Sequence, residues 1–147
     1  MIDGQSKDAK GVNVKAKFDI RAHFDSVRDM IYVNQLNVIV SVADDSQIKL
    51  WNMKNIQKQF DSDKGQLESF ATLRGHKGAL TSITGPSLQT GDISRNVSKL
   101  IFTAGHEGII RAWNIPEFRG SDEKYPQTNG QSFCVGIFDD AVKQPIW

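Results

Sequence analysis

The sequence has little that would crosslink it, anchor it in a membrane or draw it to nucleic acid. Its 147 residues contain one cysteine, Cys134, so no disulfide can form within the chain. The net charge is only +1, which provides no concentrated basic surface for a nucleic acid. No apolar run approaches the roughly 18 residues of a membrane span, and the polar N-terminus lacks the apolar core of a secretory signal. We expect a cytoplasmic protein, and a nuclear one fits the same composition.

Short runs of alternating apolar residues dominate the chain and predict strands. With 39% hydrophobic and 24% charged residues, the chain suits one modest globular domain. Residues 1–15 are expected to form a flexible N-terminal lead-in, that is, a segment that precedes the folded domain. A helical turn is expected only around Lys54–Phe60. The composition therefore predicts an all-β fold of antiparallel strands. The expected strands lie within the runs 17–23, 26–33, 36–43, 47–52, 69–76, 78–85, 98–105, 108–114 and 132–138.

Two stretches of the chain match each other closely. The sequence VSVADDSQIKLWN at 40–52 aligns with FTAGHEGIIRAWN at 102–114. In both copies a hydroxyl lies ten residues before the tryptophan and a carboxylate lies six before it, and a histidine precedes each copy. The extra length of the second copy falls in a loop rich in turn residues at 86–97. Internal repetition at about fifty residues indicates a repeat architecture.

The repeats resemble WD repeats, with a GH-type dipeptide at one end, a carboxylate in a turn and a closing Trp-Asn at the other. The resemblance covers residues 16–147, with repeats at about 17–52 and 69–114 and a third beginning at about 131–147. It implies a β-propeller of antiparallel four-stranded blades, two of them complete. Because propellers have 4–8 blades, we expect either part of a longer propeller or copies that associate through exposed sheet edges.

The resemblance also implies a buried set of four hydrogen-bonded side chains in each complete blade. A histidine, a hydroxyl, a carboxylate and an indole each need a partner when buried, and together they satisfy one another. The third repeat has Phe138 where the histidine aligns, so it is expected to lack the set. The two tetrads are His23, Ser41, Asp45 and Trp51 in the first repeat, and His76, Thr103, Glu107 and Trp113 in the second.

The same residues suggest a different class of function, a hydrolase that uses Ser41 or Thr103 as its nucleophile. The duplication favours a scaffold, since an enzyme seldom builds two triads in successive repeats. No Gly-x-Ser-x-Gly elbow is present. The histidines and the cysteine match no zinc spacing, and the glycine-bearing loop at 84–92 lacks Gly-Lys-Ser/Thr, so neither a metal nor a cofactor is expected.

Within this class the chain is similar to the striatin family, regulatory subunits of protein phosphatase 2A. The similarity rests on FATLRGHKGAL at 70–80, on AWNIP at 112–116 and on the start of the third repeat. It implies a non-enzymatic scaffold that helps bring protein phosphatase 2A and kinases together. The alternatives are a ubiquitin-ligase receptor or a subunit of a cytoskeletal or ciliary complex.

Loop side chains beside the tetrads are the expected partner-binding residues. In a propeller both loop sets that flank the tetrad open onto one face, which commonly binds other proteins. Phe24 is the most informative, because an aromatic ring beside the loop histidine is costly to leave exposed. The predicted residues are Phe24, Asp25, Arg28, Asp44, Ser46, Lys77 and His106.

Overall fold

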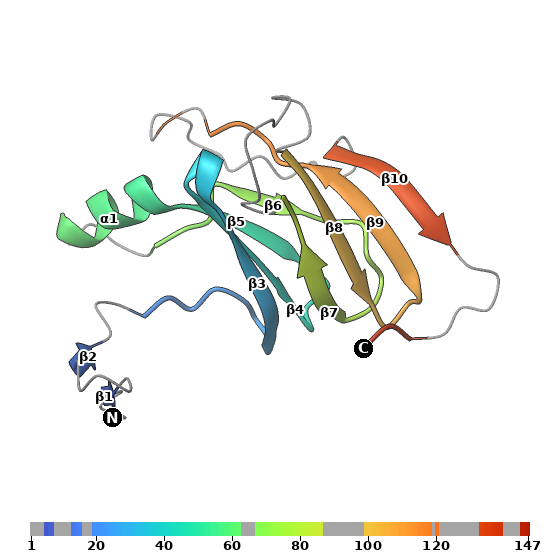
Figure 1. The fold of residues 1–147 in the computed structure, drawn as a ribbon, viewed down its shortest axis with the longest axis horizontal. Helices are drawn as coiled ribbons and strands as arrows, with labels where there is room; N and C mark the ends of the chain where they lie inside the picture. The colour runs from blue at the N-terminus through green and yellow to red at the C-terminus, as the bar shows by residue number, and fades with distance from the viewer. Residues whose placement is uncertain are drawn as a thin grey trace.

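Two antiparallel four-stranded sheets lie side by side in the computed structural model (Figure 1). The first sheet has the order β3-β4-β5-β6 and the second the order β10-β9-β8-β7. The structure describes residues 5–7, 13–15, 19–62, 67–86, 99–118, 120, 133–139 and 145–147. The elements are β1 (Gln5–Lys7), β2 (Asn13–Lys15), β3 (Val27–Val33), the 3-10 turn η1 (Asn34–Leu36), β4 (Val38–Ala43), β5 (Ile48–Asn52), α1 (Met53–Asp61), β6 (Ala71–Leu73), β7 (Leu80–Thr84), β8 (Leu100–Gly105), β9 (Ile109–Asn114) and β10 (Cys134–Asp139).

The all-β prediction is confirmed, as is the short helix expected around Lys54–Phe60. One predicted strand is wrong, because Asp19–His23 have irregular backbone. A strand needs a neighbour for its backbone groups, and no described strand lies beside this segment. A small hairpin of β1 and β2 lies in the lead-in, where the polar composition predicts no strand. The loop at 87–97 lies outside the described residues.

Strand β4 forms the centre of the first sheet because its side chains are almost continuously apolar. Val38, Val40 and Val42 are at most 2% exposed and share one face of the strand. On β5, Ile48 and Leu50 continue this face, and both are buried. A strand that is buried to this degree lies inside a fold and not at its surface.

The helix α1 begins directly after β5, at a well-formed N-cap. The Asn52 side chain accepts a hydrogen bond from the backbone N–H of Asn55 at 3.1 Å. Such a cap satisfies one of the four free amide groups at the start of a helix. Ile56 is buried on the side of α1 that faces the sheet, whereas Lys54 and Lys58 are exposed. The helix is therefore held by one apolar anchor and presents cations to solvent.

Each sheet takes its fourth strand from the following repeat. Strand β6 pairs with β5 although it lies in the second sequence repeat, and β10 pairs with β9 although it lies in the third. The sheets are thus displaced by one strand from the sequence repeats. Residues 74–79 connect β6 to β7 of the second sheet. The chain therefore links the outer strand of the first sheet directly to the second sheet.

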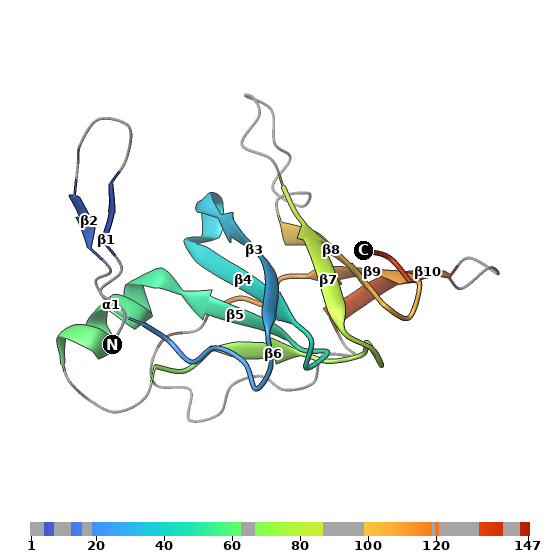
Figure 2. The same cartoon turned by 90° about the horizontal axis from the view of Figure 1, so that it is seen from below.

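The two sheets pack through β3, β4 and β7 (Figure 2). The buried cluster between and within them includes Val33, Leu80, Ile83, Ile101 and Trp113, each at most 6% exposed. Apolar burial of this kind is the main force that holds two sheets together.

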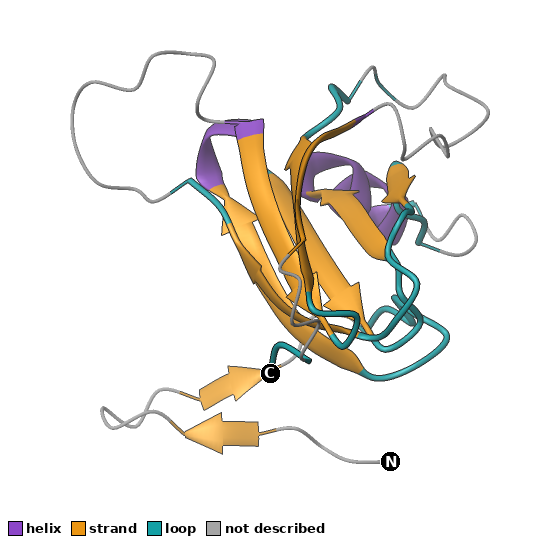
Figure 3. Ribbon diagram, turned by 90° about the vertical axis from the view of Figure 1, so that its right-hand side faces the viewer, coloured by secondary structure: helices purple, strands orange, loops and turns teal. Residues whose placement is uncertain are grey.

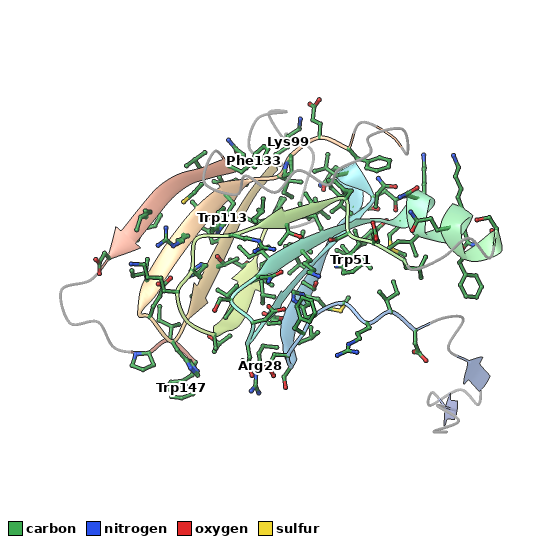
Figure 4. The ribbon with its side chains drawn as sticks, turned by 180° about the vertical axis from the view of Figure 1, so that it is seen from behind. Arg28, Trp51, Lys99, Trp113, Phe133 and Trp147 are labelled. Carbon is green, nitrogen blue, oxygen red and sulfur yellow. The ribbon has the colours of Figure 1, made fainter. Side chains whose placement is uncertain are left out.

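The connections between strands gather at two opposite ends of the sheets (Figures 1 and 3). We call one end the loop end: it holds residues 24–26, the β4–β5 turn, the β8–β9 turn and residues 145–147. We call the other the helix end: it holds η1, α1 and the segment 115–118. In Figure 4, Arg28 and Trp147 mark the loop end, whereas Lys99 and Phe133 mark the helix end.

Candidate functional site

The first tetrad joins three parts of the first sheet. His23 precedes β3, Ser41 lies in β4 and Asp45 lies in the β4–β5 turn. The ring nitrogens of His23 lie 2.8 Å from Ser41 Oγ and 3.0 Å from Asp45 Oδ2. The indole N–H of Trp51, on β5, donates to Ser41 Oγ at 3.0 Å. The structure therefore brings all four predicted side chains together.

The second tetrad has the same arrangement in the second sheet. His76 Nε2 lies 2.7 Å from Thr103 Oγ1, and the Trp113 indole N–H donates to that oxygen at 2.8 Å. The other ring nitrogen, His76 Nδ1, bonds to a carboxylate oxygen of Glu107. The longer side chain of Glu107 thus reaches the same ring nitrogen as Asp45 does in the first sheet. Trp51 and Trp113 lie near the middle of their sheets (Figure 4).

The donor roles in each tetrad follow from the carboxylate, which can only accept. The histidine Nδ1–H therefore donates to the carboxylate. In a neutral ring Nε2 is then unprotonated and accepts from the hydroxyl, whose oxygen accepts from the indole N–H. Burial lowers the pKa of His23 and of His76, although the partner carboxylates oppose this shift. Both histidines are neutral at pH 7.

The carboxylates also fix the loops that precede β3 and β7. Asp45 accepts hydrogen bonds from the backbone N–H groups of Phe24 and Gln47, each at 3.1 Å. Glu107 accepts one from the backbone N–H of Lys77 at 3.2 Å. Each tetrad therefore ties the loop before β3 or β7 to the turn beside it. The loop end is held in a defined conformation by buried polar groups.

The bonded order carboxylate–histidine–hydroxyl is also the one that a serine hydrolase uses. Here, however, Ser41 is 5% exposed and Thr103 is 1% exposed. In addition, the indole N–H of the neighbouring tryptophan occupies each hydroxyl oxygen. A nucleophile must meet its substrate, and these oxygens face the protein interior. This geometry favours a structural role over the hydrolase alternative.

Phe24 is a fixed but exposed aromatic residue at the loop end. Its side chain is 80% exposed, while its backbone N–H is bonded to Asp45. The ammonium group of Lys49 lies 5.7 Å from the ring centroid, a cation–π contact. The ring is thus presented to solvent from a loop that the tetrad holds in place.

Arg28 and Asp44 form an ion pair beside this loop. Arg28 Nε lies 2.8 Å from Asp44 Oδ1 and 2.9 Å from Oδ2. The guanidinium group lowers the pKa of the Asp44 carboxyl, and His106 of the second sheet adds a smaller lowering. Polar side chains of the two sheets therefore approach each other at the loop end.

The remaining predicted partner-binding residues also lie at the loop end. Asp25 and Lys77 are exposed, and Ser46 occupies the β4–β5 turn with a φ of 65°, where the second repeat has Gly108 with a φ of 72°. His106 is exposed, and its ring contacts Trp147 edge-on with centroids 4.6 Å apart. The structure thus gathers all seven predicted residues at one end of the two sheets.

A family comparison identifies the repeat that these tetrads stabilise. Residues 15–52 match the family described as WD domain, G-beta repeat. The chain is a WD-repeat protein. The second WD repeat has the same strand order within its sheet and the same tetrad, so the two sheets are WD blades.

Curated proteins similar to this chain include striatins. A striatin homolog of Dictyostelium discoideum is 30% identical over 102 residues, which are 69% of this chain and 12% of the relative. Human striatin is 27% identical over 109 residues, which are 74% of this chain and 13% of the relative. Human striatin-3 is 30% identical over 111 residues. The chain therefore spans only 12% to 13% of the length of these relatives.

Solved structures share the fold. A chain in an active polycomb repressive complex 2 in the basal state superposes with a TM-score of 0.57 and 21% identity, over 78% of this chain and 21% of that one. A chain in the complex from Chaetomium thermophilum gives 0.56 and 21% over 81% of this chain and 21% of that one. At this identity the likeness extends to the fold alone.

The predicted third repeat is represented among the described residues by β10 and residues 145–147. Phe138, which aligns with the tetrad histidine, is 58% exposed, and its ring centroid lies 6.5 Å from that of Phe102. Within the described segments, no group of three or more His, Cys, Asp or Glu side chains could hold a metal ion. No helix in those segments is long and apolar enough to cross a bilayer.

Three polar residues of the WD blades are missing from the predicted set. Lys49 contacts Phe24, and the equivalent Arg111 lies with its Nε 3.6 Å from Glu107 Oε1. Lys49 and Arg111 occupy equivalent positions in the aligned repeats, and this match could have identified both residues. Asp29 accepts a hydrogen bond from the backbone N–H of Ile83 at 3.0 Å and so joins the two blades. No repeat signal could have found it, since Ser82 occupies the equivalent position.

Proposed function

We propose that this WD-repeat chain is a non-enzymatic scaffold for protein–protein interaction and that the loop end is its partner-binding surface. The single observation that carries this proposal is the presentation of Phe24. Its ring is 80% exposed although its backbone is anchored by the tetrad carboxylate. Exposed aromatic and arginine side chains on a rigid frame are the residues that most often supply binding energy at interfaces.

The neighbours of Phe24 support the same surface. Arg28 and Asp44 pair beside it, and His106 adds a polar group from the second blade. An aromatic ring surrounded by a polar rim is the usual composition of a non-obligate protein interface. Two tetrads hold these groups in place, so little conformational entropy is lost when a partner binds.

Similarity to striatins suggests the partners. We propose protein phosphatase 2A and associated kinases, with the chain acting as part of a signalling assembly. A cytoplasmic location belongs to this proposal, and it rests on the composition and the single cysteine.

A matched pair of phenylalanine variants tests the surface. The chain would be immobilised and the binding of purified protein phosphatase 2A, and separately of a purified partner kinase, measured by interferometry. Phe24→Ala should weaken binding by roughly fivefold or more, the minimum expected of a residue that contributes to an interface. Phe60→Ala, which changes a 40% exposed ring on α1, should leave binding unchanged.

Two results would reject parts of this proposal. Absence of binding to the phosphatase and to the kinase would reject the striatin-like partners. Equal losses in the two variants would reject the loop end as the binding surface. Circular dichroism should show that both variants keep the native fold, because both rings are substantially exposed.

Self-association is a further part of the proposed function. Strand β10 lies at the edge of the second blade and exposes Val135, Ile137 and Phe138, each more than half accessible. An exposed edge with apolar side chains invites pairing with another chain. Sedimentation should show a dimer or larger species that Ile137→Lys converts to monomer. A monomer in the native chain would reject this part.

A further inference from the structure

A pocket of mixed polar and apolar lining at the helix end is suited to an anionic ligand. It encloses about 450 Å³ between η1, the start of α1 and the segment that follows β9. It lies at the opposite end of the blades from Phe24, so it stands independently of the proposed function of the loop end. Its lining comprises Gln35, Leu36, Asn37, Asn52, Lys54, Asn55, Lys58, Phe118 and Gly120.

The charged groups of this lining are all positive. Lys54 and Lys58 are exposed on α1, and none of the described residues that line the pocket carries a carboxylate. Among the described residues, the ion pairs formed by side chains involve neither lysine. The positions are one helical turn apart, so the side chains lie on the same side of α1 with Cβ atoms about 5–6 Å apart. Two adjacent cations without a counter-charge favour a ligand with two negative groups.

The amide side chains add hydrogen-bond donors to these cations. Asn52 must direct its oxygen to the backbone N–H of Asn55, since that group can only donate. Its NH2 group therefore faces away from the cap. Asn37 bonds through its oxygen to the hydroxyl of Tyr32 at 2.8 Å, which leaves its NH2 group available as well. Both amides thus offer donors, as an anion requires.

The backbone holds these donors in position. Asn37 adopts a left-handed conformation with a φ of 53°, and its N–H bonds to Asn34 O at 3.1 Å. The backbone N–H of Met53 bonds to Asn37 O at 3.0 Å and thereby connects η1 to the first residue of α1. The amides and the first lysine are consequently parts of one connected turn and helix start.

An apolar wall completes the pocket. Phe118 is half-buried, and its ring packs edge-on against Phe70 with centroids 5.3 Å apart. Leu36 provides a second apolar contact. A fixed aromatic wall beside two cations suits a ligand that has an apolar side chain next to its negative groups.

We propose that this pocket binds an acidic peptide segment of a partner protein, with two carboxylates separated by one residue and an apolar residue beside them. In an extended peptide, alternate side chains point to the same side and are roughly 6.5–7 Å apart. This spacing places two carboxylates within reach of the two lysines, whose flexible stems take up the small difference. The apolar residue packs against Phe118, and the two asparagine amides bond to carboxylate or peptide oxygens.

The first test measures binding of a fluorescein-labelled peptide to the whole chain. The probe is Gly-Leu-Glu-Ser-Glu-Leu-Gly, and its matched control has both Glu replaced by Gln. The acidic peptide should bind at least about tenfold more tightly at low salt and should lose affinity as salt screens the charges. Equal affinity for the two peptides would overturn the proposal.

Variants then locate the binding. Lys54→Gln combined with Lys58→Gln should weaken binding of the acidic peptide by at least about fivefold, since exposed ion pairs contribute modestly. The matched control, Arg21→Gln combined with Arg74→Gln, removes two exposed cations that do not line the pocket and should have no effect. Equal losses in the two double variants would show attraction by net charge alone and would overturn the site. All four side chains are exposed, so the variants should fold.

Nuclear magnetic resonance gives a second readout, which reports where the peptide contacts the chain and not how tightly it binds. Addition of the acidic peptide should shift the side-chain NH2 signals of Asn37 and Asn52 and leave that of Asn114, an exposed asparagine at the end of β9, unchanged. Absence of shifts at the first two residues would overturn the site. A peptide with phosphoserine in place of both Glu that binds more than tenfold tighter would overturn the assignment to carboxylates. None of these outcomes depends on the loop end, so failure here and failure of the proposed function can be told apart.

Discussion

The indole N–H of Trp113 donates a hydrogen bond to Thr103 Oγ1 at 2.8 Å, in the buried centre of the second blade. Trp113 and Thr103 are 0% and 1% exposed, so neither group can exchange its partner for water. The same hydroxyl also bonds to His76. The Thr103 hydroxyl thus links two members of its tetrad, because it accepts a hydrogen bond from Trp113 and donates one to His76.

We expect Thr103→Val to destabilise the protein by about 2–4 kcal/mol. Valine has nearly the shape of threonine, so the loss comes from a buried indole N–H and a buried histidine nitrogen that are left without partners. Urea unfolding followed by tryptophan fluorescence measures the change. The matched control is Thr84→Val on the same blade, where the side chain is exposed and the expected change is within about 0.5 kcal/mol. Equal effects of the two substitutions would contradict the role of the tetrad.

The residues of the tetrads recur at fixed spacings in the sequence, and the resemblance to WD repeats implied that they bond to one another. Ser41 and Thr103 lie ten residues before their tryptophans, and this part of each repeat is a strand, a short turn and a strand with no room for variation. A spacing that local backbone geometry determines recurs in each repeat, so a single sequence is enough to detect it. Position along the two strands then places the hydroxyl beside the indole.

Features that depend on contacts between repeats could not be predicted in this way. The bond between Asp29 and the backbone of Ile83 joins two blades, and it has no counterpart in the repeat pattern. The pocket at the helix end depends on Phe118 approaching α1 from 57 or more positions further along the chain. The predicted strand at 17–23 was wrong for a related reason, because alternation indicates a strand only where a neighbouring strand pairs with it.

Stability should fall with decreasing pH because of the two tetrad histidines. Burial lowers the pKa of His23 and of His76 below the ordinary value of 6.5. The unfolded chain therefore takes up protons at a higher pH than the folded chain does. The stabilisation by the neutral rings is complete above pH 6.5 and is lost as the pH falls below it toward the folded pKa values. The loss is at most about 1.4 kcal/mol per pH unit for each histidine.

Urea midpoints at pH 7.5, 6.5 and 5.5 measure this dependence. His76→Gln should be less stable at pH 7.5 and should show a shallower fall between pH 6.5 and 5.5, because one of the two titrating rings is gone. Thr84→Val changes an exposed side chain that does not titrate and should keep the slope of the native chain. An unchanged slope in His76→Gln would show that other groups cause the pH dependence.

The bond between Asp29 and Ile83 should couple the two blades. Asp29 Oδ2 accepts from the Ile83 N–H at 3.0 Å, and Oδ1 accepts from the N–H of Met30 at 2.9 Å. Asp29→Ala removes both acceptors and should destabilise the protein by about 1–3 kcal/mol. The amide hydrogen of Ile83 should then exchange faster with solvent. Asp25→Ala, which removes an acceptor within an exposed turn of one blade, should leave that exchange rate unchanged.

The exchange of other amides tests whether the effect is local. Only Ile83 and its neighbours on β7 should exchange faster in Asp29→Ala, while amides at the centre of β4 should change only as far as global stability falls. A uniform acceleration across both blades would show that Asp29 contributes to overall stability without coupling the blades specifically.

Gly105 should tolerate no side chain, because the second blade approaches its own loop at this position. A Cβ atom at Gly105 would lie 2.1 Å from the backbone oxygen of Ala79, a separation that real Cβ atoms do not show. That oxygen accepts the backbone N–H of His106 at 2.9 Å, so it cannot move without breaking the link at the β8–β9 turn. Gly105→Ala should therefore destabilise the protein by about 2 kcal/mol or more and release the loop end of the second blade.

Gly136→Ala is the matched control for this prediction. A Cβ atom there would lie 3.5 Å from the Cβ of Ala112, an ordinary contact, so the expected change is within about 0.5 kcal/mol. Thermal unfolding of the two variants gives the comparison. Because Gly105→Ala displaces the turn that carries Glu107, the fluorescence of Trp113 should also change in the folded state. A Gly105→Ala variant as stable as Gly136→Ala, with unchanged fluorescence, would show that the loop moves away from the added methyl group at no cost.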